Sequence, residues 1–68
     1  MKRITLAAAR INAGMTQREA AERLNVTQKT LCKWEKARTF PNALQIDAIC
    51  DLYGVSYEQI IFLPIKTA

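Results

Sequence analysis

The sequence predicts a small all-α fold, a compact bundle of five helices, and three observations lead to this prediction. The chain has 68 residues, which is enough for one domain but too few for a β-sandwich or an α/β cofactor domain. Half of its residues are hydrophobic, and only two are glycine and two are proline, so a disordered or collagen-like chain is excluded. Helix-capping signals recur along the chain, and no strand pattern competes with them in its middle.

Four polar residues mark the expected helix starts. Thr16–Glu19 is a capping box, in which the threonine hydroxyl accepts from the Glu19 amide and the glutamate reaches back. Asn42 and Ser56 repeat this arrangement with a glutamine three residues later, and Thr27 caps a further helix without a box. These signals predict helices near residues 6–13, 17–24, 28–36, 43–53 and 57–62.

The carboxyl end of the chain is less regular than the rest. Residues 60–65 are rich in isoleucine, phenylalanine and leucine, and they can continue the last helix or leave it as an extended segment. We expect residues 1–62 to form one domain and residues 63–68 to form a short tail.

Charge is distributed unevenly along the chain. Residues 1–38 contain nine basic and three acidic residues, whereas residues 39–68 contain one basic and three acidic residues. A protein that presents one face to a polyanion is expected to show this asymmetry, although a domain with an accidental charge distribution can show it as well.

The content of reactive residues excludes several classes of site. Two cysteines are too few for a disulfide framework, and without histidine they cannot complete a zinc site. The chain also lacks paired carboxylates at useful spacing and a glycine-rich phosphate loop, so we expect no enzyme activity, cofactor, metal or small-molecule substrate. Reduced thiols and the lack of any long apolar run indicate a cytoplasmic protein that does not enter membranes.

Residues 17–36 have the pattern of two helices joined by a sharp turn. Ala21 is small enough for the second helix to cross closely, and Asn25 tolerates the left-handed conformation that such a turn needs. Leu31 and Trp34 point to the core, so the opposite face of the second helix is rich in lysine. An exposed helix of this kind suits insertion into a DNA major groove, whereas the alternative is a solvated basic face.

The chain resembles the helix-turn-helix domains of the phage repressor and Cro superfamily, also called the Xre family. The resemblance covers residues 6–62 and is carried by the string from Gly14 to Thr27, by Leu31, Trp34-Glu35 and Pro41, and by residues 52–56. It implies a five-helix fold that binds operator DNA as a two-fold dimer, in a bacterial cytoplasm and associated with the nucleoid when bound. It also points to a phage, prophage or mobile-element origin.

The resemblance and the outward face together assign the DNA-binding residues. Base edges would be contacted by Gln28, Lys29, Cys32 and Lys33. Phosphates would be contacted by Arg10, Thr16, Gln17, Thr27, Thr30, Lys36 and Arg38, although Thr27 can also serve as a cap alone. Gln17 stands at a helix N-terminus, where free amides and the helix dipole favour an anion.

Arg10 and Glu35 both fall on core-facing positions, and the resemblance implies that they form a structural ion pair; the alternative is two unrelated side chains that reach solvent. The chain departs from the family at Asn25, where the family favours glycine, and at Lys36-Ala37, where it favours Asn-Gly. Because alanine in a left-handed cap costs about 1 kcal/mol, we expect the second helix of the motif to run on or to end differently here.

Two functions remain open from the sequence. The first is a sequence-specific DNA-binding transcriptional regulator, a repressor that acts as a dimer through Tyr57, Ile61, Phe62 and Leu63. The second is an antitoxin or another protein-interaction module that uses the same apolar carboxyl end. Simple closure of a small core would also explain these apolar residues.

Overall fold

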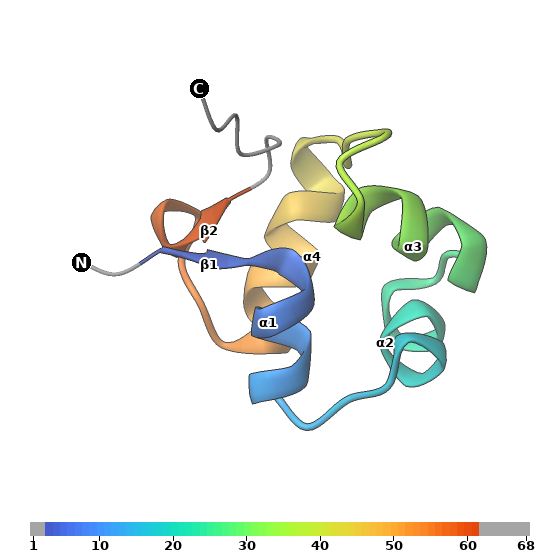
Figure 1. Cartoon of the computed structure of the whole chain (residues 1–68), viewed down its shortest axis with the longest axis horizontal. Coiled ribbons are helices and arrows are strands. Elements are labelled where there is room, and N and C mark those ends of the chain that lie inside the picture. The colour runs from blue at the N-terminus through green and yellow to red at the C-terminus, as the bar shows by residue number, and fades with distance from the viewer. Residues whose placement is uncertain (1–2, 62–68) are drawn as a thin grey trace.

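The computed structural model describes residues 3–61, which fold into four α-helices and a short two-stranded sheet (Figure 1). In chain order the elements are β1 (Ile4–Thr5), α1 (Leu6–Asn12), α2 (Gln17–Leu24), α3 (Gln28–Glu35), α4 (Ala43–Tyr53), the 3₁₀ turn η1 (Tyr57–Gln59) and β2 (Ile60–Ile61). The sheet lies on the side of the molecule away from α2 and α3, with α1 and α4 between (Figure 1).

The five-helix, all-α prediction is wrong at the carboxyl end. The expected fifth helix is a single 3₁₀ turn, after which Ile60 adopts an extended conformation with φ −104° and ψ 137°. β2 then pairs in parallel with β1, with Ile4 opposite Ile60 and Thr5 opposite Ile61. Branching at Cβ favours the extended backbone for isoleucine, and this pairing buries Ile60 in the core.

The helix starts follow the capping signals. Both arms of the box are formed at Thr16 and Glu19, and Asn42 and Gln45 exchange two hydrogen bonds of 2.8 Å. Thr27 Oγ1 accepts from the amide of Thr30 at 3.1 Å. The sequence analysis identified no cap for α1, but Thr5 Oγ1 provides one by accepting from the amide of Ala8. Local sequence therefore sets where each of the four α-helices begins.

A residue with positive φ follows each α-helix within two residues of its end. These residues are Gly14, Asn25, Ala37 and Gly54. After α3, the amide of Arg38 donates to the carbonyl of Lys33 at 2.9 Å and that of Ala37 donates to Trp34 at 3.0 Å, which is the Schellman arrangement. The expectation that α3 would run on or end differently is therefore wrong. Two capping hydrogen bonds offset the strain of a left-handed alanine.

The core is built from one small set of apolar side chains. Its buried members are Leu6, Ala9, Ala20, Ala21, Leu31, Trp34, Ile49, Tyr53 and Ile60. Leu31 of α3 and Ile49 of α4 are the largest that are fully buried. Ala20 and Ala21 are also fully covered, so the second helix of the motif packs against a surface of small side chains, as the sequence predicted for Ala21. This packing decides which face of α3 remains outside.

Candidate nucleic-acid interface

Helix α3 divides its side chains between the core and solvent. Leu31 and Trp34 are 0% and 5% exposed, whereas Gln28, Lys29 and Lys33 lie on the exposed side. Cys32 is half-buried on the flank. The first turn of α3 contains no acidic residue, so the positive end of the helix dipole and the lysine charges have the same sign. This face is built to attract an anion.

The two threonines at the start of α3 form hydrogen bonds with each other. Thr27 caps the helix through the amide of Thr30, and the two hydroxyl oxygens are 2.9 Å apart. Thr16 is similarly engaged at the start of α2, where its hydroxyl is 3.1 Å from Glu19 Oε1. A phosphate oxygen at either place would have to share these hydroxyl groups with the caps.

Three predicted site residues from three different helices meet in one cluster. Arg10 Nε of α1 donates to Glu35 Oε2 of α3 at 2.8 Å, and Arg10 Nη2 lies 3.4 Å from Glu35 Oε1. Gln17 Nε2 of α2 donates to Glu35 Oε1 at 2.9 Å. The side chains of Arg10 and Glu35 are only 13% and 6% exposed. We call Arg10, Gln17 and Glu35 the junction cluster.

The junction cluster also holds the turn between α1 and α2. Arg10 Nη1 donates to the carbonyl oxygen of Met15 at 2.9 Å, directly before the capping residue Thr16. Sequence reasoning missed this contact and the hydrogen bond between Gln17 and Glu35. The two core-facing charges signalled the ion pair, but backbone carbonyls and a polar residue at a helix start carry no pattern that would identify their partners.

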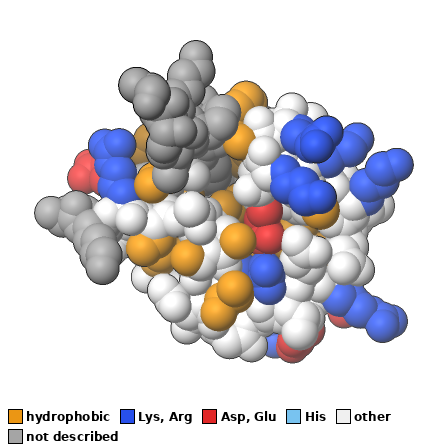
Figure 2. Space-filling view, viewed as in Figure 1, with side chains coloured by type: hydrophobic (Ala, Val, Ile, Leu, Met, Phe, Trp, Pro, Cys, Tyr) orange, Lys and Arg blue, Asp and Glu red, His pale blue; other side chains and the backbone are white. Residues whose placement is uncertain are grey.

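Cationic side chains gather on one side of the molecule, over α2 and α3 (Figure 2). Lys29 and Lys33 of α3 are exposed there, and Lys36 and Arg38 are exposed directly after this helix. Arg18 of α2 is also exposed and forms a 3.7 Å ion pair with Glu22. Four of the predicted DNA-contacting residues, Lys29, Lys33, Lys36 and Arg38, are therefore exposed on α3 or directly after it.

Tyr53 of α4 is a second feature that the sequence analysis did not identify. Its side chain is buried, and its hydroxyl has no hydrogen-bond partner among the residues that the structure describes. Burial and the nearby carboxylate of Glu35 raise the pKa of Tyr53 to about 12, while Arg10 acts in the opposite direction. The hydroxyl therefore lies in the electrostatic field of the junction cluster.

The structure describes only two of the four residues proposed for a dimer. Tyr57 is 60% exposed on η1, whereas Ile61 is half-buried in β2. Phe62 and Leu63, like the tail at 63–68, lie outside the described residues.

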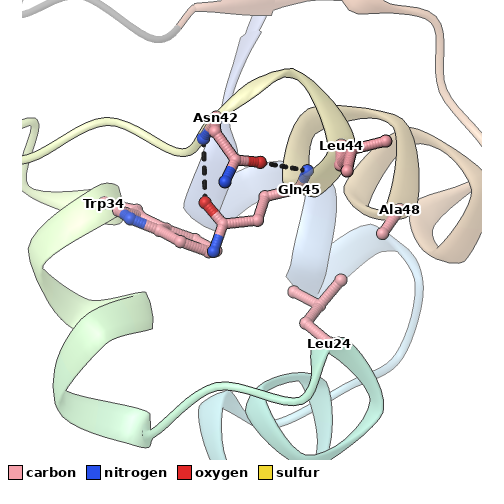
Figure 3. Close-up of a pocket in the computed structure, with 6 residues that line it drawn as sticks. All are labelled: Leu24, Trp34, Asn42, Leu44, Gln45 and Ala48. Carbon is pink, nitrogen blue, oxygen red and sulfur yellow. Dashed lines mark hydrogen bonds between the residues drawn. The ribbon is translucent and has the colours of Figure 1, made fainter.

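An apolar groove of about 310 Å³ lies between α2, α3 and the start of α4 (Figure 3). Leu24, Trp34, Leu44 and Ala48 line it, and the side chains of Asn42 and Gln45 are engaged in the cap of α4. The groove thus offers contact area but few free polar groups. Across residues 3–61 no three His, Cys, Asp or Glu residues gather as metal ligands, and no helix there is long and apolar enough to span a membrane.

Comparison with known families identifies the motif. The model of the helix-turn-helix domain family matches residues 3–60, so the chain belongs to this family. The family is typical of Xre/Cro-like DNA-binding domains, in agreement with the resemblance seen in the sequence. No curated protein and no solved structure matched the chain.

Proposed function

We propose that this protein is a sequence-specific DNA-binding transcriptional regulator that reads operator DNA through α3. The observation that carries the proposal is the division of α3, which buries Leu31 and Trp34 and leaves Gln28, Lys29 and Lys33 exposed. A polar, cationic helix held in this way against a second helix has the form of a major-groove reader.

Within this function, the residues of α3 read bases. Gln28 pairs with adenine through its carboxamide, and Lys29 pairs with guanine O6 or N7. Cys32 and Lys33 contact bases one turn further along the helix, where Lys33 can also reach a phosphate. The orientation of Gln28, exposed at the first position of α3, supports this assignment.

Phosphate contacts surround the base-reading residues. They involve Arg10, Thr16, Gln17, Thr27, Thr30, Lys36 and Arg38. The exposure of Lys36 and Arg38 supports their assignment as phosphate contacts. The position of Gln17 at the N-terminus of α2 supports its assignment, because the first amides of a helix have no partner within the helix. Thr16 and Thr27 contribute through the helix starts that they cap.

The regulator is proposed to be a phage-type repressor that binds a palindromic operator as a two-fold dimer. One recognition helix covers few base pairs, and two-fold symmetry places a second helix about 34 Å away, one turn of DNA further along. The dimer would use Tyr57 and Ile61 together with Phe62 and Leu63. The exposure of Tyr57 supports this choice.

Selection of bound duplexes from a random pool, followed by mobility-shift titration, tests the function. We expect a palindromic consensus and an affinity that falls steeply as salt rises. Gln28→Ala should cost about 1–3 kcal/mol on the selected site and relax the preference at one position, whereas Arg38→Ala should weaken all sequences alike.

A protein that retains no duplex, or that binds all duplexes equally, would contradict the proposal. Binding to a partner protein without binding to DNA would instead support the alternative of an antitoxin or interaction module.

A further inference from the structure

The junction cluster contains an arrangement that an ion pair alone does not require. The two carboxylate oxygens of Glu35 accept hydrogen bonds from three donors. Oε1 has the shorter hydrogen bond with Gln17 Nε2, at 2.9 Å, and the longer one with Arg10 Nη2, at 3.4 Å. Glu35 is nearly inaccessible to solvent, so each of its oxygens depends on such donors. Gln17 is therefore part of what stabilises this carboxylate.

This contact also determines which way the carboxamide of Gln17 points. A carboxylate only accepts hydrogen bonds, so the nitrogen of the amide must face Glu35, because a flipped amide would place two oxygens together. Nε2 has two protons, and Glu35 takes one of them. The second proton makes no hydrogen bond among the described residues. Gln17 is the first residue of α2, where the first backbone amides have no partner within the helix.

We propose that Glu35 is a positioning residue for DNA binding, which holds the side chain of Gln17 so that its second Nε2 proton meets a phosphate oxygen at the N-terminus of α2. The proposal rests on the proposed function and adds a role for a residue that makes no contact with DNA itself. Holding Gln17 before DNA arrives removes part of the entropy cost of ordering a flexible side chain on binding.

Arg10 makes this arrangement compatible with a phosphate. An isolated carboxylate near the site would repel the anion, but Arg10 contacts both oxygens of Glu35 and balances its charge. Arg10 also fixes the carbonyl of Met15, so the turn before Thr16 and the side chain of Gln17 are held by the same group of contacts. The side-chain donor and the helix N-terminus are thereby positioned together.

A double-mutant cycle on DNA affinity tests the positioning role. In Glu35→Gln, a single amide oxygen must serve Arg10, so the amide nitrogen of the new side chain faces Gln17. The amide of Gln17 must then flip to accept from it, and Nε2 is no longer held in its original position. We expect Glu35→Gln to weaken binding about tenfold in the wild-type background and no more than about twofold in Gln17→Ala. Glu22→Gln, an exposed site on α2, is the matched control for the loss of one carboxylate.

Equal losses in both backgrounds would overturn the positioning role, because Glu35 would then act independently of Gln17. Tighter binding by Glu35→Gln than by Glu22→Gln would also overturn it, since Glu35 would then hold Gln17 away from DNA. A wild-type protein that binds no duplex overturns both this inference and the proposed function. A wild-type protein that binds DNA, with equal losses from Glu35→Gln in the two backgrounds, overturns the inference alone.

A measurement on the unmodified protein covers the case in which Glu35→Gln does not fold. The side-chain amide of Gln17, assigned by its loss in Gln17→Ala, should show slow solvent exchange of one proton in the free protein. On DNA, that proton should remain protected and the second should shift. The side-chain amide of Gln28, exposed on α3, is the control and should exchange rapidly in the free protein. Equally rapid exchange at Gln17, or release of the protected proton on DNA, would overturn the proposal.

Discussion

At the scale of single residues, the junction cluster contains two nearly buried, oppositely charged side chains in direct contact. A guanidinium and a carboxylate are almost withdrawn from water, and their contacts join α1, α2 and α3. Removing one partner of such a pair leaves a charge that is poorly solvated and unpaired. In a domain of this size, with a marginal total stability, this cost is a large fraction of the free energy of unfolding.

Arg10→Ala and Glu35→Ala are each expected to lower the free energy of unfolding by about 3–5 kcal/mol. The double variant should lose less than the sum, because removing both charges leaves neither one unpaired. Urea unfolding followed by circular dichroism measures all three. Additive effects below about 1 kcal/mol would contradict a stabilising buried pair.

For Tyr53 we expect the opposite result, a substitution that does not lower the free energy of unfolding. Its hydroxyl is buried without a described partner, so Tyr53→Phe removes an unsatisfied polar group and should leave the free energy of unfolding at pH 7 unchanged or raise it by about 1 kcal/mol. Thermal unfolding measures the change. A loss of more than about 1 kcal/mol would show that the hydroxyl does make a stabilising hydrogen bond.

The same residue links stability to pH. Because the folded-state pKa of Tyr53 is raised from 10.0 to about 12, the folded protein keeps the phenol proton more tightly than the unfolded chain. This contribution to stability is complete below pH 10 and is lost as the pH rises towards 12. Tyr53→Phe should lack this part of the alkaline destabilisation. Identical alkaline profiles for both proteins would contradict the shift.

At the scale of elements, the four α-helices share one design, with a capping side chain at the start and a left-handed residue after the end. Glycine or asparagine occupies three of the four left-handed positions, and these residues tolerate positive φ at low cost. Ala37, with φ 58°, is the exception. It stands directly after the proposed recognition helix, between Lys36 and Arg38.

Ala37→Gly is expected to stabilise the protein by about 0.5–1 kcal/mol, because it relieves the left-handed alanine while both capping hydrogen bonds remain possible. Ala48→Gly is the matched control. Ala48 is exposed within α4, so the same substitution there should destabilise by about 1 kcal/mol. Thermal unfolding of both variants gives the comparison, and a loss of stability in Ala37→Gly would show that the cap is not strained.

At the scale of the whole molecule, the basic surface and the sheet are separated. Lysines and arginines gather over α2 and α3, whereas β1 and β2 join the two ends of the described chain on the other side (Figures 1 and 2). A dimer built near the sheet would leave the basic surfaces of both subunits available for one DNA duplex. The two halves of the fold can therefore serve recognition and assembly separately.

Tyr57→Glu tests assembly without disturbing the core, because Tyr57 is 60% exposed. We expect the variant to stay folded, to sediment as a monomer and to lose cooperative binding to palindromic sites, since a buried glutamate at a dimer seam costs desolvation energy. Sedimentation and mobility-shift assays measure these effects. Unchanged cooperativity would place the dimer contact elsewhere, and equal affinity of the wild type for half-sites and palindromes would contradict a dimer altogether.

The sequence by itself determined the four α-helices and the division of α3 into buried and exposed faces. These features depend on local capping groups and on helical periodicity, which neighbouring residues specify among themselves. The sequence identified the helix starts at Thr16, Thr27 and Asn42 from the residues that follow each of them. It identified Leu31 and Trp34 as core residues from their spacing within α3.

The tertiary structure alone decided features that depend on residues far apart in the chain. The pairing of Ile4 with Ile60 replaced a fifth helix by an extended strand, because long-range hydrogen bonds and burial outweigh the local preference at the end of the chain. The hydrogen bond between Gln17 and Glu35 likewise exists only because the packing of α2 against α3 brings the end of one helix to the start of the other. Patterns within a helix identify which face is buried, but they do not name the partner that a polar group will find across the core.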